Sequence, residues 1–185
     1  GIPADREINI QHKLSLLKPA VVELQPDGVH LGFIRWPGFW EIWLDDVKRK
    51  DMPEFCFGSH TLQRFSADAN IDLPVNDAKA SADIIKTNHR DAWKLWKCGE
   101  VVKTVSRVKS ELRKHKSDLQ IAINTLPFFQ TEFDNAVEEV FGQSPSKLSE
   151  AAEVFEVMAY HQILRKDANW PGKIGTDIKR RSGQT

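Results

Sequence analysis

The sequence predicts an α+β protein in which a small N-terminal antiparallel β-barrel, of the SH3 or Tudor type, is followed by a helical bundle. Aromatic and β-branched residues crowd between Pro26 and Phe65, where turn sequences separate them. After Pro74 the apolar residues recur instead at helical spacing. Strand-like and helix-like segments are thus separated along the chain, which is typical of α+β proteins.

Composition indicates a globular chain without a global charge. Its 185 residues include 26 basic and 26 acidic side chains, so no overall field draws it toward nucleic acid or a membrane. The two cysteines form no C-x-x-C pair, which favours a reducing, intracellular compartment. No apolar run has the length of a membrane span, so no membrane partner is expected. No cofactor and no metal site are indicated.

The barrel is expected over residues 20–75, after a lead-in over 1–19 that fits either a short helix or a flexible segment. Pro-Asp-Gly and Pro-Gly sequences are expected to reverse the chain between its strands. The expected strands are 20–24, 29–35, 39–44, 55–57 and 61–65.

The helical region is expected over residues 76–168. Within it, residues 119–126 fit either a helix or a short strand, and apolar spacing predicts a last long helix over 145–159. Residues 169–185 contain three glycines and the cluster Lys179-Arg180-Arg181, so we expect a flexible basic tail there.

The first candidate site is an aromatic pocket. Phe33, Trp36, Phe39 and Trp40 surround a tight bend between two expected strands. Aromatic rings around a cationic headgroup bind methylated ammonium through cation–π attraction. The same rings would also fill the core of a small barrel, and both readings remain open at this point.

These residues carry a family resemblance. The run Pro26–Leu44 resembles the opening of a PWWP domain, a Tudor-like chromatin reader, with Gly38-Phe39-Trp40-Glu41 (or the register one residue earlier) in place of the family tetrapeptide. Residues 53–60 are similar to the family's third strand, and the resemblance covers about residues 20–96. It implies a nuclear protein that binds nucleosomal DNA weakly and without sequence specificity, and that also binds a methylated histone tail. It places Trp40 in the ligand pocket and Cys56 where the family has an aromatic wall, which Trp36 or Phe33 would then supply.

Two basic segments are candidates for contacts with DNA phosphates. In the alternative interpretation, basic and acidic helices simply present complementary solvated faces. The residues expected to contact phosphates are Lys48, Arg49, Lys50, Lys103, Arg107, Arg113 and Lys114.

Two further functions compete with the chromatin reader. Asp27, Asp46 and Lys48 match the loose PD-(D/E)xK spacing of magnesium-dependent nucleases, in which carboxylates hold the metal and the lysine orients water. No catalytic signature of high specificity accompanies them, so a protein that is not an enzyme is favoured. The third hypothesis is a helical adaptor whose acidic residues over 132–156 dock a protein partner.

Overall fold

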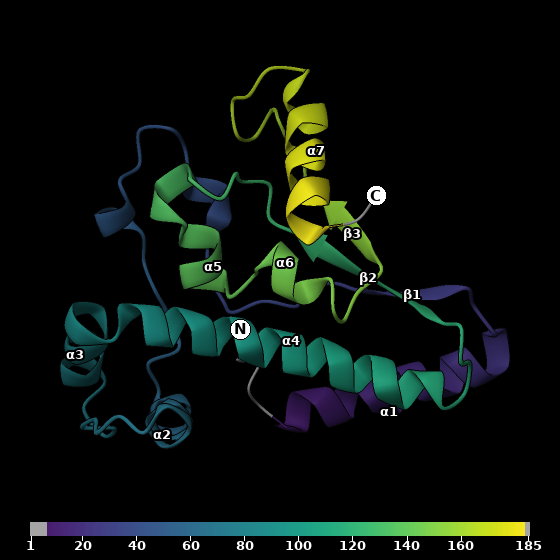
Figure 1. Cartoon of the computed structure of the whole chain (residues 1–185), viewed down its shortest axis with the longest axis horizontal. Coiled ribbons are helices and arrows are strands. Elements are labelled where there is room, and N and C mark those ends of the chain that lie inside the picture. The colour runs from purple at the N-terminus through teal and green to yellow at the C-terminus, as the bar shows by residue number, and fades with distance from the viewer. Residues whose placement is uncertain (1–6, 184–185) are drawn as a thin grey trace.

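A small parallel sheet lies at the centre of the chain. The computed structural model describes residues 7–183 (Figure 1). Its strands are β1 (Gly28–Leu31), β2 (Gln120–Thr125) and β3 (Val154–Val157). They lie in the order β1-β2-β3, and both pairings are parallel. Parallel neighbours require crossover connections, which helices supply here.

Helices precede, connect and follow the strands. The helix α1 (Glu7–Leu24) precedes β1. The first crossover contains η1 (Trp40–Ile42), η2 (Arg49–Asp51), α2 (Ser59–Ala69), α3 (Ala78–Asn88) and α4 (Arg90–Arg113). The second contains η3 (Glu132–Asp134), α5 (Ala136–Phe141) and α6 (Pro145–Leu148), and α7 (Trp170–Ser182) follows β3. Figure 1 shows α4 lying alongside α1, with α2 and α3 near the amino end of α4.

The main core lies between α4 and one face of the sheet. Val101, Val105 and Val108 recur along α4 at the spacing of one helical face, and all three are buried. They share a cluster with Ile121 and Ile123 of β2, whose burial alternates along the strand as a half-covered sheet requires. This packing fixes β2 against α4, and β1 and β3 are then positioned by their pairing with β2.

Within the described residues the other face of the sheet is open. His30, Val154 and Glu156 project from it and are exposed. Parallel sheets are normally covered on both faces, so this open face is unusual. His30 and Glu156 approach each other across it, with His30 Nε2 3.5 Å from a Glu156 carboxylate oxygen.

Two satellite cores flank the main one. The first gathers Trp40 and Trp43 with Phe128, Phe141 and Ile174, which joins η1 to α5 and α7. The second joins α2, α3 and the first half of α4; its buried members are Leu62, Phe65, Leu73, Ile85 and Trp93. α4 therefore contributes to both the main core and the second satellite core.

The predicted antiparallel barrel is wrong, although the broad α+β class holds. Residues 20–75 contain only one strand, β1, and its partner β2 comes from far along the chain. Residues 39–44 alternate like a strand, but Trp40 and Trp43 belong to a 3₁₀ turn, in which side chains three apart point the same way. Both rings are consequently buried together. Residues 59–69, which include the expected strand 61–65, form α2.

Several helical expectations also change. Of the two alternatives for residues 119–126 the strand is present, as β2, whereas the expected long helix over 145–159 is only the short α6 followed by β3. Valine and phenylalanine in 154–157 favour the extended backbone. The expected tail contains α7, which packs against β3, and the lead-in contains the first part of α1. Residues 1–6 and 184–185 lie outside the described residues.

Candidate functional site

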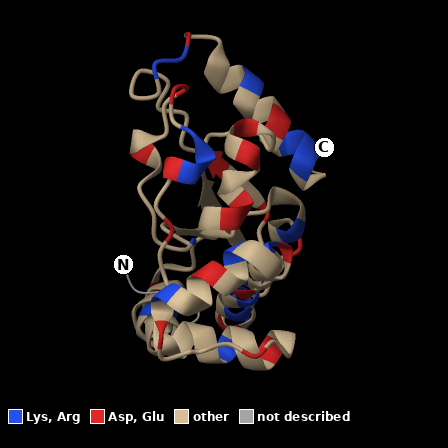
Figure 2. Ribbon diagram, turned by 90° about the vertical axis from the view of Figure 1, so that its left-hand side faces the viewer, with Lys and Arg blue, Asp and Glu red and all other residues tan. Residues whose placement is uncertain are grey.

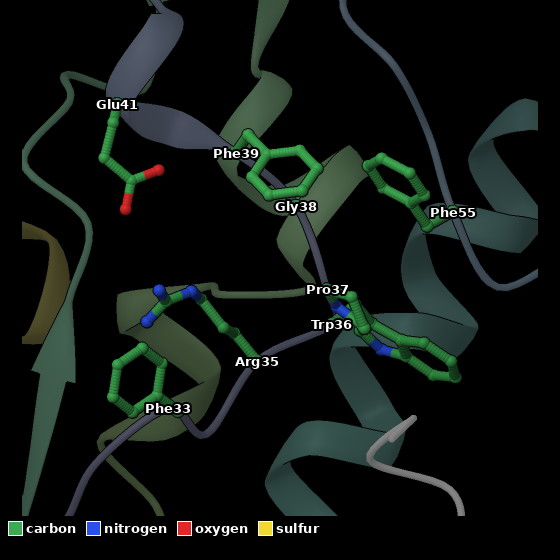
Figure 3. A pocket seen from close by; sticks show the side chains of 8 residues that line it. All are labelled: Phe33, Arg35, Trp36, Pro37, Gly38, Phe39, Glu41 and Phe55. Carbon is green, nitrogen blue, oxygen red and sulfur yellow. The ribbon is translucent and has the colours of Figure 1, made fainter. Parts of the chain in front are cut away.

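A cavity of about 530 Å³ lies just after the carboxyl end of β1 (Figure 3). Its volume falls within the range of small-molecule sites. Parallel sheets commonly place ligands at the carboxyl ends of their strands, because the loops that leave these ends converge there. The residues that line the cavity are Phe33, Arg35, Trp36, Pro37, Gly38, Phe39, Glu41 and Phe55.

Trp36 anchors the loop that carries most of these residues. Its backbone N–H donates to the carbonyl of Phe141 at 3.0 Å, and its indole N–H donates to the carbonyl of Lys97 at 3.1 Å. The Trp36 ring is buried, with its centroid 5.6 Å from that of Trp96. The loop is thereby fastened to both α4 and α5, and the cavity is largely formed before any ligand arrives.

The cavity also has an uncommon backbone conformation. Phe33 has φ = 57°, and Cys56, beside the lining residue Phe55, has φ = 75°. Bulky residues rarely adopt positive φ, and such strain concentrates at functional sites. The Arg35 N–H donates to the carbonyl of Phe33 at 2.9 Å and closes this tight turn. The turn holds the Phe33 ring at the surface, where 78% of the residue is exposed.

Phe39 and Phe55 form an aromatic rim. Their rings meet edge to face, with centroids 5.6 Å apart. Both residues are exposed, Phe39 by 59%. A ligand can cover the apolar surface of these exposed rings. Each Å² of apolar area that it removes from water adds favourable free energy of binding.

Two opposite charges share the cavity. The Arg35 guanidinium lies 4.8 Å from the centroid of the Phe33 ring, and Figure 3 shows it facing the carboxylate of Glu41. Burial lowers the pKa of Arg35, and the negative charge of Glu41 partly opposes that shift. Neither side chain forms an ion pair within the described part of the chain. Both charged groups are therefore available to bind an oppositely charged group of a ligand.

The structure gathers part of the predicted aromatic pocket. Phe33, Trp36 and Phe39 line the cavity, whereas Trp40 and Cys56 do not. Trp40 is 3% exposed and stacks on Tyr160, with centroids 5.9 Å apart. Sequence reasoning did not select Arg35 and Glu41, although their place inside an aromatic run is a signal that could have identified them.

Most of the basic residues predicted to contact DNA are engaged by acids within the chain. The pairs are Arg49–Glu54, Lys103–Glu100, Arg107–Glu7, Arg113–Glu153 and Lys114–Glu111. Figure 2 shows basic and acidic residues interspersed along the helices in view. Phosphate contact stays a prediction, and Lys48 and Lys50 are the two of these residues that are both exposed and without an ion pair in the described part of the chain.

The carboxylates of the nuclease hypothesis lie on separate elements. Asp27 precedes β1 at its amino end, whereas Asp46 lies in the turn after η1. Among residues 7–183, no group of three or more His, Cys, Asp or Glu side chains is arranged to hold a metal ion. Of the acids expected to dock a protein partner, Glu139 and Glu153 are paired within the fold.

None of the helices described over 7–183 combines the length and apolar character that a membrane span requires. Comparisons of the chain with protein-family models, curated proteins and solved structures find no match. The site's own geometry therefore carries the functional argument.

Proposed function

We propose that this chain binds a small molecule, or the end of a peptide, that joins an apolar or aromatic portion to an anionic group. The observation that carries the proposal is the Arg35 guanidinium, which is half-buried among aromatic rings and has no ion-pair partner in the described residues. Its cavity lies at the carboxyl end of a parallel strand, where ligands commonly bind.

Arg35 suits a carboxylate or a phosphate. A guanidinium offers a planar set of donors that matches either group with two parallel hydrogen bonds. Burial raises the free-energy cost of the unpaired charge, so an anion that arrives recovers part of that cost. Phe39 and Phe55 would cover the apolar portion of the ligand.

Hydrocinnamate and its alcohol, hydrocinnamyl alcohol, provide a matched test by isothermal titration calorimetry. We expect hydrocinnamate to bind at least about tenfold more tightly, because only the carboxylate makes charge-assisted bonds with Arg35. Arg35→Gln should remove this difference, and Arg180→Gln, on the exposed surface of α7, should leave it intact. Equal binding of the acid and the alcohol to the wild-type protein would overturn the proposal.

A methylated ammonium group, as the PWWP resemblance implies, is the second candidate ligand. The observation that favours it is Glu41, a carboxylate on the same cavity as three exposed phenyl rings. The two candidates respond oppositely to one variant: Arg35→Gln should weaken an anion but strengthen a cation, because it removes a like charge. Titration of the wild-type protein and of Arg35→Gln with trimethyllysine peptides separates the two candidate ligands. Contacts with nucleosomal DNA, and a nuclear location, stay predictions.

A further inference from the structure

We infer that the cavity recognises a zwitterion: Arg35 takes the carboxylate of an α-amino acid, Glu41 takes its ammonium group, and the rim of Phe39 and Phe55 takes its side chain. This inference rests on the proposed function of the same cavity and adds the ligand class. The residues involved all line the one cavity at the carboxyl end of β1.

The two charges are close enough to influence each other without pairing. Glu41 is the charged residue whose field opposes the desolvation of Arg35, yet no oxygen of Glu41 lies within ion-pair distance of the guanidinium. Figure 3 shows the two groups facing each other with space between them. A ligand that carries both charges fills this space and satisfies both groups.

The loop fixes the separation between the two charges. Arg35 precedes the anchored Trp36, which bonds to α4 and α5. Glu41 belongs to η1, where Trp40 and Trp43 are buried on either side of it. Neither residue's backbone can move without pulling a tryptophan out of the core. A site prepared in this way loses less conformational entropy when the ligand binds.

Charge balance selects the zwitterion over simpler ligands. A lone anion gains Arg35 but is repelled by Glu41, and a lone cation gains Glu41 but is repelled by Arg35. The face of the Phe33 ring is already covered by the guanidinium, which leaves Phe39 and Phe55 for an apolar side chain. Three separate contacts around the α-carbon also distinguish the two enantiomers of the amino acid.

Three ligands that differ by one group test the inference. L-Phenylalanine carries both charges, hydrocinnamate lacks the ammonium group and phenethylamine lacks the carboxylate. Calorimetric titration at about pH 6.5 keeps the carboxylates and ammonium groups of these ligands charged. We expect L-phenylalanine to bind at least about tenfold more tightly than either of the others, and more tightly than its D-enantiomer.

Two variants show which protein group is responsible. Glu41→Gln should remove the advantage of L-phenylalanine over hydrocinnamate without weakening hydrocinnamate, and Glu150→Gln, an exposed acid after α6, should change nothing. If hydrocinnamate and L-phenylalanine bind the wild-type protein equally, the inference is wrong and the proposed function stands. If neither of them binds, both are wrong. Glu41 is exposed, so circular dichroism should confirm that the variant is folded.

Discussion

Gly38 is the residue on which the wall of the cavity most directly depends. A Cβ atom at this position would lie 2.4 Å from Cε1 of Phe141, whose ring is fully buried. The ring cannot retreat, so Gly38→Ala should displace the loop and lower the free energy of unfolding by about 1–3 kcal/mol. It should also weaken any ligand of the cavity. Urea denaturation measures the first effect and calorimetric titration the second.

Gly99 provides the matched control. It lies inside α4, and a Cβ atom there would meet no atom within 4 Å. Gly99→Ala should therefore stabilise the protein by about 0.5–1 kcal/mol, because alanine has the higher helix propensity. If Gly38→Ala proves as harmless as Gly99→Ala, the contact between the loop and Phe141 is not structurally important.

Because of the buried Lys97, we expect the free energy of unfolding to increase with pH in the alkaline range. It is 1% exposed, and its ammonium group donates to the carbonyl of Val140 at 3.1 Å. Burial lowers the pKa of Lys97 to about 8 from its ordinary value of 10.5, and the charge of Glu54 only partly opposes this. Between these two pH values the unfolded chain binds more protons than the folded one, so the free energy of unfolding increases with pH.

The rise due to Lys97 should amount to about 3 kcal/mol between pH 8 and pH 10.5. Above pH 9 the Cys98 thiol, whose pKa burial raises to about 12, opposes this rise, so urea denaturation measures it as the difference between the wild-type protein and Lys97→Met across the window. Lys97→Met should keep the buried volume and abolish the rise. Lys147→Met, at an exposed position, should retain it. A wild-type protein that loses stability steadily across the window would contradict the assignment.

At the scale of residues, the sequence predicted the aromatic part of the site better than the charged part. Phe33, Trp36 and Phe39 stand together in the chain and also together in space. Arg35 and Glu41 matter only because the loop turns both into one cavity, and that turn depends on a positive φ at Phe33. Nothing in the residue type of Phe33 predicts this conformation.

At the scale of elements, a charged network fastens η2 to α4 and α5. Glu139 of α5 accepts hydrogen bonds from Arg49 at 3.1 Å and from Arg90 at 2.6 Å. Burial raises the pKa of Glu139, but the hydrogen bond from Arg90 and the charge of Arg49 outweigh it, so the pKa is lowered overall. The stability that this carboxylate contributes is present above its ordinary pKa and is lost as pH falls through its lowered folded-state pKa.

Glu139→Gln should therefore destabilise the protein by about 1–3 kcal/mol at neutral pH, because it removes the charge that Arg49 and Arg90 share, while Arg49 keeps Glu54 and Arg90 keeps Asp134. The difference from wild type should shrink as the pH falls through the lowered pKa of Glu139, where the wild-type carboxylate also becomes neutral. Thermal unfolding monitored by circular dichroism at several pH values provides the measurement. Glu150→Gln, at an exposed position whose side chain forms no hydrogen bond or ion pair with another described residue, should stay within about 0.5 kcal/mol of wild type.

Helices and strands differed in how far the sequence predicted them. The apolar stripe of α4 repeats over many residues, and this helix lies within the helical region expected over 76–168. The strands β1 and β3 have four residues each, too few for a period to be distinguished. Their partner in the sheet, β2, is distant in sequence, so its pairing depends on the packing of α4 rather than on a local turn. Local turn signals consequently predicted a small antiparallel barrel that does not form.

At the scale of the whole molecule, the three cores should differ in how easily they open. The main core joins α1, α4 and all three strands, whereas the core of α2 and α3 rests on the first half of α4 and includes no strand. A region supported by fewer buried contacts opens with a smaller free energy than the molecule as a whole. Native-state hydrogen exchange should show weaker protection in α2 and α3 than in β2.

Two leucine truncations make this difference measurable. Leu62 of α2 and Leu112 of α4 are both fully buried, so each change to alanine should cost about 2–5 kcal/mol at its own site. Leu62→Ala should speed exchange in α2 and α3 and leave β2 protected, because the main core does not include Leu62. Leu112→Ala should speed exchange in β2 as well, because it weakens the core that every strand shares. Equal loss of protection throughout the molecule in both variants would mean that the three cores unfold as one unit. Trp36 of the cavity contacts the α2–α3 core through Trp93, so the cavity would then share the stability of the whole chain.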